Sequence, residues 1–274
     1  MPAISMPLFQ FEMRAAPGFS LGYGFSIERF QFSDTHRIAL FSEQDIWHML
    51  SARWALVHDG DEPDGYKAQS NAILMGFRVL SERQPPFIKF RLSSAPEQST
   101  RIQQPMTYNY AANRERGAYS AQELDRVRSA FRHMQAMDAI STRTHNALYF
   151  LYRAFHADKW IDSFLLMTSA LEALFSKDAP GGATAAITTR VASFLGSADR
   201  CTKKDLEELY DLRSQMTHGR IAVGDDAGDN LAKLEHLEHV TNAAIRKLLE
   251  SQQYLRFETK AGRDVFMGTL NVAL

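Results

Sequence analysis

From Ser120 onward the chain carries one amphipathic helical pattern after another, and this feature constrains its fold more than any other. Apolar residues recur three and four positions apart, which is the period of an α-helix that packs by one face. Ser120 and Glu123 form the capping-box signature that begins the first of these helices. The predicted helices cover residues 120–137, 141–156, 158–175, 184–195, 202–218 and 230–254. Short connections between such helices favour an up-and-down helical bundle.

The residues before this point follow a different pattern. Phe19 to Phe32 alternates aromatic with small or polar residues, as a pair of half-buried strands does. Ser42 to Val57 has helical spacing, whereas Asn71 to Leu80 and Phe87 to Leu92 are predicted to be strands. The polar, turn-rich segment 93–116 is predicted to end this region.

The two patterns together predict an α+β protein. We expect a β-containing N-terminal domain of unassigned role at residues 1–117 and an all-α bundle at residues 118–256. The tail at 257–274 has an ambiguous pattern, and a strand that returns to the N-terminal sheet is compatible with it.

Composition excludes several classes of protein. The apolar share of 45% supports a sizeable core, and a formal net charge of −1 gives no global attraction to nucleic acid or to anionic membranes. The single cysteine, Cys201, excludes an internal disulfide. Neither a signal-peptide pattern nor a run of the ~18 apolar residues that a membrane helix needs is apparent. We therefore expect a cytoplasmic protein without a membrane partner.

The predicted helix at 202–218 contains an arginine at a position where its pattern favours an apolar residue. Thr202 is a candidate N-cap, and Gly219 is a candidate for the residue just past the C-terminal end. Arg213 falls within an apolar stripe, so its guanidinium needs an anionic or hydrogen-bonding partner in the bundle. The other residues of the stripe are Leu206, Leu209, Tyr210 and Met216.

Arg213 and His218 form an R-x4-H pair, which carries the minimum chemistry for cutting RNA without a metal. Histidine can accept or donate a proton near neutral pH. Arginine can hold a phosphate through its planar fork and stabilise the charge of the transition state. The alternative is an ordinary ion-paired arginine and a surface histidine, and spacing alone does not decide between the two.

The same spacing occurs at Arg53–His58 and Arg128–His133, so the motif has three copies in the chain. Positions five apart on a helix point roughly 140° away from each other. Arg213 and His218 can therefore meet at one phosphate if the helix ends at the histidine. They can also meet if two chains each supply both residues across a two-fold axis.

Glu172 is the only charged residue between Ser163 and Phe175. A lone carboxylate in such an apolar stretch either lies on a narrow exposed strip or is paired inside the bundle. Arg213 and Arg190 are the natural partners, and a structural salt bridge is favoured over a catalytic role for Glu172.

Three blocks, SFLLMTSALEALFS, ITTRVASFLG and LYDLRSQMTHGR, occur in this order, and residues 141–251 around them resemble the HEPN helical domain, most closely its Apea-like branch. The resemblance implies a compact, commonly dimeric bundle. Family members with the R-x4-H pair are metal-independent ribonucleases, often in toxin–antitoxin or antiphage systems. The resemblance implies Arg213 and His218 as the catalytic pair, with Glu172 and Arg190 as residues that position or brace the site. Ser214 departs from the Asn, Asp or His that often follows the arginine, and some HEPN proteins are non-catalytic.

The sequence therefore predicts a metal-independent endoribonuclease that needs no cofactor or metal. Its partners would be an RNA substrate, a second copy of the chain that completes a composite site, and an antitoxin or other regulatory partner. The alternative is a non-catalytic interaction or nucleotide-binding module that acts through dimerisation. His236 and His239 are three residues apart and could form half of a metal site, but a solvated helix face is favoured for them.

Overall fold

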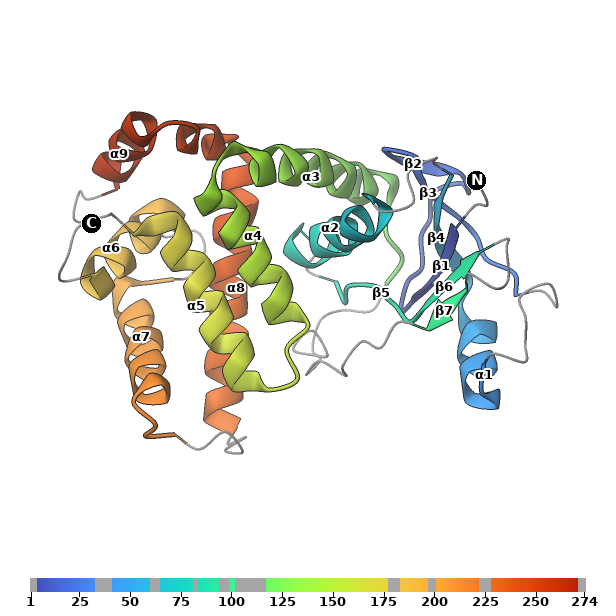
Figure 1. Cartoon of the computed structure of the whole chain (residues 1–274), viewed down its shortest axis with the longest axis horizontal. Helices are drawn as coiled ribbons and strands as arrows, with labels where there is room; N and C mark the ends of the chain where they lie inside the picture. Colours follow the sequence, from blue (N-terminus) through green and yellow to red (C-terminus); the bar gives the residue numbers. More distant parts are fainter. Residues whose placement is uncertain are drawn as a thin grey trace. The chain divides into compact units, whose positions relative to one another are not determined.

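The structure of the chain is a computed structural model that forms two compact units (Figure 1). Among the described residues, those up to Arg132 form the first unit and those from His133 onward form the second. An N-terminal antiparallel sheet followed by helices confirms the predicted α+β class. The structure describes residues 4–32, 41–59, 65–80, 83–93, 99–101, 117–176, 183–196, 201–221 and 228–270.

The first unit is built on a seven-stranded sheet with the order β2-β3-β4-β1-β6-β7, in which β5 also pairs with β1. All the named strand pairs are antiparallel. The predicted strand pair at 19–32 is confirmed as the hairpin β2–β3, and the predicted strand at 87–92 is present as β5 and β6. The strands are β1 (Ile4–Phe9), β2 (Phe19–Gly22), β3 (Phe25–Arg29), β4 (Trp54–His58), β5 (Phe87–Ile88), β6 (Phe90–Ser93) and β7 (Thr100–Arg101).

Two predictions in this unit are wrong. The predicted strand at Asn71–Leu80 is the second part of helix α2 (Gly65–Leu80). A continuous apolar run is compatible with either a buried strand or a buried helix. Here the more polar residues before the run are also helical, and the resulting segment of 16 residues has the length of a helix.

The helix predicted at 42–57 divides into α1 (Glu43–Ser51) and strand β4. Ala52 has extended backbone angles, and β4 then pairs with β1 on one side and β3 on the other. Backbone pairing on both edges outweighs the helical spacing of the side chains here. Most of the polar segment 93–116 lies outside the described residues.

Helix α3 (Ala121–Ile140) contributes its first part to the first unit and its second part to the second. It begins with the predicted capping box, because the Ser120 hydroxyl accepts from the Glu123 backbone N–H at 3.2 Å and Glu123 accepts from the Ser120 backbone N–H at 2.8 Å. Arg83 donates to the same carboxylate at 2.9 Å. Burial raises the pKa of Glu123, but the bonds from Ser120 and Arg83 outweigh it and lower the pKa to about 2.

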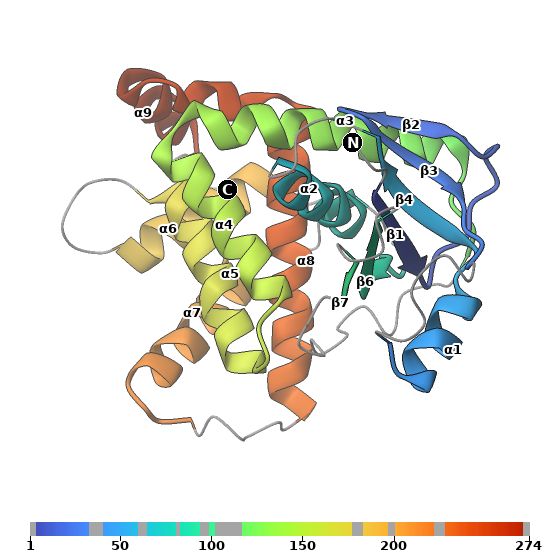
Figure 2. The ribbon, with the colours of Figure 1, turned by 45° about the vertical axis from the view of Figure 1, so that its right-hand side comes forward.

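The second unit is helical, and helices α4 to α8 lie close to the predicted ranges (Figure 2). Helix α5 is the central element, since it contacts α4, α6, α7 and α8. Its side chains Trp160, Phe164, Met167 and Leu171 are completely buried. Helix α5 has Lys159 as its N-cap and so begins slightly later than the predicted range 158–175. The helices are α4 (Thr142–Phe155), α5 (Trp160–Phe175), α6 (Ala183–Leu195), α7 (Lys203–Thr217) and α8 (Gly228–Glu250).

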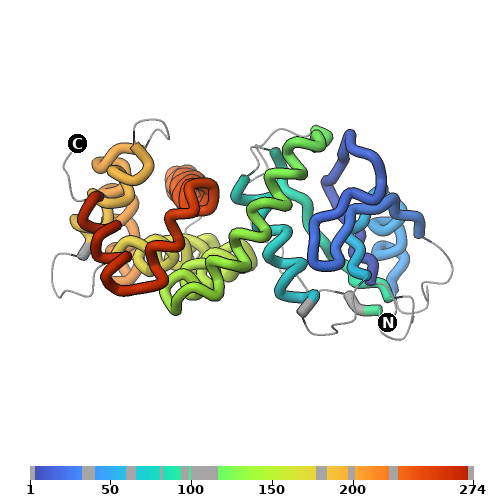
Figure 3. Tube along the Cα trace, turned by 90° about the horizontal axis from the view of Figure 1, so that it is seen from above, coloured from blue at the N-terminus to red at the C-terminus, as the bar shows by residue number. Residues whose placement is uncertain are grey.

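The tail predicted as a possible strand is helical instead. Helix α8 leads into the 3-10 helix η5 (Gln253–Phe257) and then into α9 (Lys260–Thr269), which Figure 3 shows in dark red. Phe257 and Phe266 are buried against each other, and Phe266 also meets the ring of Phe194 in α6. This packing within the second unit decides the conformation of the tail. Within the described ranges, no helix has both the length and the apolarity to cross a membrane.

We expect Glu123→Gln to destabilise the protein near neutral pH and to have a smaller effect in acid. The folded-state pKa of about 2 lies below the ordinary value of 4.5, so the ionised carboxylate stabilises the fold above pH 4.5, and this contribution disappears as the pH falls toward 2. Thermal melts of both proteins across this range measure the effect. The matched control is Glu207→Gln, which removes an exposed i,i+4 pair with Lys203 and should change little at any pH. A difference that grows in acid would contradict the assignment.

Candidate functional site

Helix α7 begins with the predicted N-cap. The Thr202 hydroxyl accepts from the Asp205 backbone N–H at 3.2 Å, and the Asp205 carboxylate accepts from the Thr202 backbone N–H at 2.8 Å. These two bonds satisfy donors that a helix start leaves open, and they fix where α7 begins.

The C-terminal end of α7 is closed by a Schellman motif. Gly219 donates to the Met216 carbonyl at 3.0 Å, and Arg220 donates to the Gln215 carbonyl at 2.9 Å. Gly219 has a φ of +67°, a left-handed conformation that glycine adopts without strain. His218 is therefore the C-cap, directly after the last helical residue Thr217, as the glycine after it predicts.

Arg213 pairs with Glu172 of α5, which confirms that the arginine in the apolar stripe has an anionic partner. Arg213 Nη2 lies 3.2 Å from Glu172 Oε1 and 3.4 Å from Oε2. The two side chains are 34% and 29% exposed, so the pair is partly desolvated and one face remains accessible. Burial raises the pKa of Glu172, and the positive charge of Arg213 opposes this rise.

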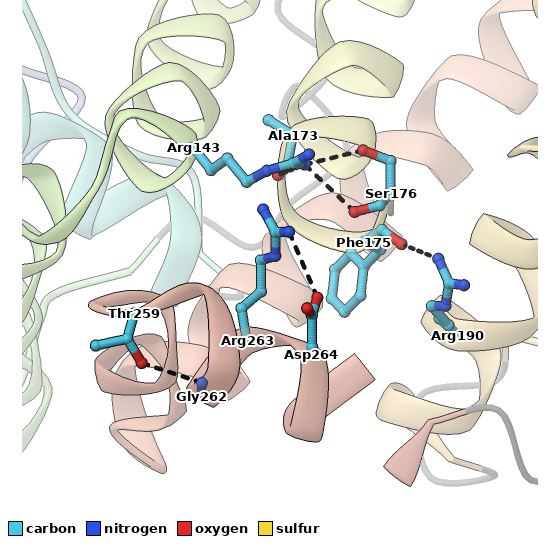
Figure 4. A network of polar contacts seen from close by, with 9 residues as sticks. All are labelled: Arg143, Ala173, Phe175, Ser176, Arg190, Thr259, Gly262, Arg263 and Asp264. Carbon is cyan, nitrogen blue, oxygen red and sulfur yellow. Dashed lines mark hydrogen bonds and ion pairs between the residues drawn. The ribbon is translucent and has the colours of Figure 1, made fainter. Parts of the chain in front are cut away.

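Arg190 of α6 contacts the end of the same helix. Its Nη1 donates to the Phe175 carbonyl at 2.7 Å, and its burial lowers the pKa of the guanidinium (Figure 4). Arg143 of α4 donates to the carbonyls of Ala173 and Ser176 at 3.1 and 3.3 Å. The last carbonyls of a helix lack intrahelical donors and form the negative end of its dipole, so both arginines stabilise this end. Sequence analysis identified Arg190 but missed Arg143, which belongs to another helix pattern.

The last helix brings a further buried arginine to the second unit. Arg263 of α9 is 8% exposed and pairs with Asp264 at 3.4 Å. Its side chain points from α9 toward the last turn of α5, and α9 itself is capped by Thr259, which accepts from the Gly262 backbone N–H at 3.0 Å (Figure 4). Sequence analysis did not identify this residue, because the tail was not predicted to be helical.

His218 has an exposed side chain. Its backbone N–H donates to the Ser214 carbonyl at 3.0 Å, and that carbonyl also accepts from the Thr217 hydroxyl at 3.0 Å. In the described part of the chain, neither a hydrogen bond nor an ion pair joins the His218 side chain to Arg213 or Glu172. Helix α7 is regular up to Thr217, so its geometry separates positions 213 and 218 by roughly 140° around the axis.

Arg53 and His58, the first of the other R-x4-H copies, have separate contacts. Arg53 is 71% exposed and lies 3.5 Å from Glu12. His58 is buried in β4 and meets the rings of Phe25 and Tyr66. A buried histidine stacked between aromatic rings has a packing role and is closed to an RNA strand.

Arg128 and His133 form the remaining copy, on α3. Arg128 pairs with Asp125 one turn away, while His133 Nδ1 lies 2.9 Å from the Tyr254 hydroxyl. Each member of this copy therefore has a local structural partner. Among the three copies, only 213–218 combines an arginine paired in the bundle with a histidine exposed at a helix end.

Tyr210 is a residue whose significance the sequence did not reveal, since it appeared only as part of the apolar stripe. It is 2% exposed, and its hydroxyl has no hydrogen-bond partner in the described part of the structure. Burial raises its pKa, the charge of Glu172 raises it further, and Arg213 opposes the rise. Tyr210 therefore lies within the electrostatic reach of the ion pair.

The described residues contain no group of three or more His, Cys, Asp or Glu side chains that could hold a metal ion. His236 and His239 thus remain without a third ligand in this part of the chain. Comparison of the chain with protein-family models, curated proteins and solved structures returned no match. The resemblance to the HEPN domain therefore stays a prediction from the sequence.

We expect Gly219→Ala to destabilise the second unit by about 1 kcal/mol, because alanine is strained in the left-handed conformation that ends α7. No atom lies within 4 Å of an added Cβ, so the cost is conformational and does not arise from a clash. Gly228→Ala is the matched control, since it has equally open space and no positive φ. Urea unfolding of the three proteins measures the difference. Equal stability of the two variants would show that the motif contributes nothing.

We expect the stability deficit of Arg213→Met to grow as the pH rises above 4.5. Without the arginine, burial raises the pKa of Glu172 unopposed, so the protonated carboxyl is tolerated below 4.5 and ionisation costs stability as the pH rises through the folded-state pKa. Unfolding curves at a series of pH values measure the deficit. The double variant Glu172→Gln, Arg213→Met removes the charge and should lose the pH dependence. A deficit that is the same at every pH would contradict the pairing as a source of stability.

Proposed function

We propose that this chain is a metal-independent endoribonuclease of the HEPN type, with Arg213 and His218 as its catalytic pair. The observation that carries the proposal is the contrast within α7. Arg213 is held by Glu172 with 34% of its side chain exposed, and His218 is exposed at the capped end of the helix. The two other copies of the same spacing have structural contacts instead.

The chemistry requires only proton transfer and charge stabilisation. The ribose 2′-oxygen attacks the phosphorus as the bond from phosphorus to the 5′-oxygen breaks, which leaves a 2′,3′-cyclic phosphate. His218 accepts the 2′-hydroxyl proton or donates a proton to the departing 5′-oxygen. The Arg213 fork binds the non-bridging oxygens, where negative charge accumulates in the transition state.

A dimer would overcome the angular separation of Arg213 and His218 on α7. The angular separation of roughly 140° keeps one straight helix from aiming both residues at one phosphate. Two copies related by a two-fold axis would bring two histidines and two arginines to one site. One His218 would then act as the base and the other as the acid.

Glu172, Arg190 and Ser214 would have supporting roles. Glu172 orients the guanidinium of Arg213, and Arg190 secures α6 to the end of α5 through the Phe175 carbonyl. Ser214 holds the end of α7 because its carbonyl accepts from His218. The side chains of Glu172 and Arg190 and the backbone carbonyl of Ser214 would position the site without reacting.

The biological setting that we propose follows from the sequence resemblance. A ribonuclease of this type would act in the cytoplasm as a toxin or antiphage effector on an RNA substrate. An antitoxin or other regulatory partner would then be needed to restrain it, because uncontrolled RNA cleavage harms the cell that makes it.

The second candidate is a non-catalytic interaction or nucleotide-binding module that acts through dimerisation. The observation that favours it is the Arg213–Glu172 pair itself, since a salt bridge between two helices is sufficient to explain a partly buried arginine. Ser214 also favours this candidate, because Asn, Asp or His often follows the arginine in the HEPN family.

Cleavage of a mixed-sequence RNA in the presence of EDTA tests the two proposals. We expect His218→Ala to lower the rate by about 100-fold or more while its melting temperature is unchanged, because the histidine transfers the proton from an exposed position. Arg213→Ala should also lose activity. The controls are His239→Ala and Arg53→Ala, an exposed histidine of α8 and an arginine that is 71% exposed.

The module predicts a different outcome. No variant would differ in RNA cleavage, His218→Ala would change neither activity nor melting temperature, and Arg213→Ala would only lower the melting temperature. Wild-type nuclease activity in either Arg213→Ala or His218→Ala would contradict the ribonuclease proposal.

A further inference from the structure

Tyr210 buries a hydroxyl group without a compensating hydrogen bond. The residue is 2% exposed, and its hydroxyl oxygen is fully buried with no partner in the described part of the structure. A buried polar group in this state is unfavourable, and phenylalanine would fill the same space without it. Packing alone therefore does not explain why this position holds a tyrosine and not a phenylalanine.

The position of Tyr210 places it beside the path of Arg213 toward α5. The two residues are three apart on α7 and share one face of the helix. Side chains of a helix lean toward its N-terminus, so Arg213 reaches Glu172 across the turn that carries Tyr210. Both charges of the ion pair act on the Tyr210 hydroxyl.

The proposed function gives Arg213 two anionic partners that compete for it. The guanidinium is paired with Glu172 in the free protein, and it would have to turn part or all of its fork to an RNA phosphate. The Glu172 carboxylate is 29% exposed, so losing its partner leaves a partly desolvated charge. Breaking a pair in this way is costly because the remaining charge is not fully hydrated.

We propose that Tyr210 is a positioning residue whose hydroxyl donates to the Glu172 carboxylate when Arg213 turns to a phosphate. In the free protein Arg213 Nη2 contacts both oxygens of this carboxylate, and the hydroxyl has no partner among the described residues. The hydroxyl becomes the replacement donor when the arginine leaves. The identity of the phosphate as that of RNA rests on the proposed ribonuclease function, whereas the exchange of donors on Glu172 does not.

A double-mutant cycle of folding stability tests the exchange of donors on Glu172 without RNA, because Arg213→Met removes the arginine permanently. In the wild-type background, Tyr210→Phe should leave the ratio of folded to unfolded protein unchanged or raise it. In the Arg213→Met background, the same substitution should lower that ratio by about tenfold, since it removes a hydrogen bond to a charged group. Urea unfolding near neutral pH measures all four proteins. An equal effect of Tyr210→Phe in both backgrounds would overturn the proposal.

Two controls separate this exchange from general packing. Tyr254→Phe removes a hydroxyl that bonds His133 at 2.9 Å, and it should cost the same in both backgrounds. The combination Glu172→Met, Arg213→Met removes the acceptor, so the effect of Tyr210→Phe should disappear there. A persistent effect without Glu172 would assign Tyr210 a different partner and overturn the proposal.

Binding of a 2′-O-methyl RNA oligonucleotide of mixed sequence, which resists cleavage, tests the ligand. In EDTA, Tyr210→Phe should raise the Kd about tenfold, while Tyr254→Phe leaves it unchanged. If the stability cycle shows coupling but the oligonucleotide does not bind, the ribonuclease proposal fails and the role of Tyr210 toward Glu172 stands. If the oligonucleotide binds equally well to wild type and Tyr210→Phe, the exchange plays no part in RNA binding and the proposal is overturned.

Discussion

The ion pair between Arg213 and Glu172 is the interaction on which the candidate site depends. It joins α7 to α5, the helix that α4, α6, α7 and α8 all contact. Its strength comes from partial burial, because a fully exposed pair would contribute little and a fully buried one would be costly to desolvate. Arg143 and Arg190 complete the same region by donating to the last carbonyls of α5. The end of α5 is thus stabilised by arginines from three different helices.

The same pair also restricts what else Arg213 can bind. If Arg213 turns the nitrogen that now contacts Glu172 toward a phosphate, the carboxylate loses this donor and needs another. The unpartnered hydroxyl of Tyr210 would meet that need. His218 differs from Arg213, because the Schellman motif around Gly219 leaves its side chain exposed at the helix end. A structural pair and an exposed histidine therefore coexist on one helix.

The three R-x4-H copies show why a short motif carries so little information by itself. Their spacing is identical, yet His58 is buried between aromatic rings and His133 bonds Tyr254, whereas His218 is exposed. Each outcome follows from what surrounds the helix or strand that holds the residue. Glu172 was the useful clue, because a single carboxylate in an apolar helix already requires a partner, and Arg213 was one of only two candidates.

The sequence by itself determined the features that local chemistry controls. The capping boxes at Ser120 and Thr202 and the glycine after His218 set helix ends through bonds between near neighbours, and these were predicted correctly. Tertiary structure alone decided whether 71–80 and 257–274 are helical, since an apolar run is compatible with helix or strand until its packing partners are known. It also decided that Arg143 reaches the end of α5 and that the Tyr210 hydroxyl has no partner among the residues that the structure describes. Contacts between residues distant in the chain leave no periodic signal, so only the folded molecule reveals them.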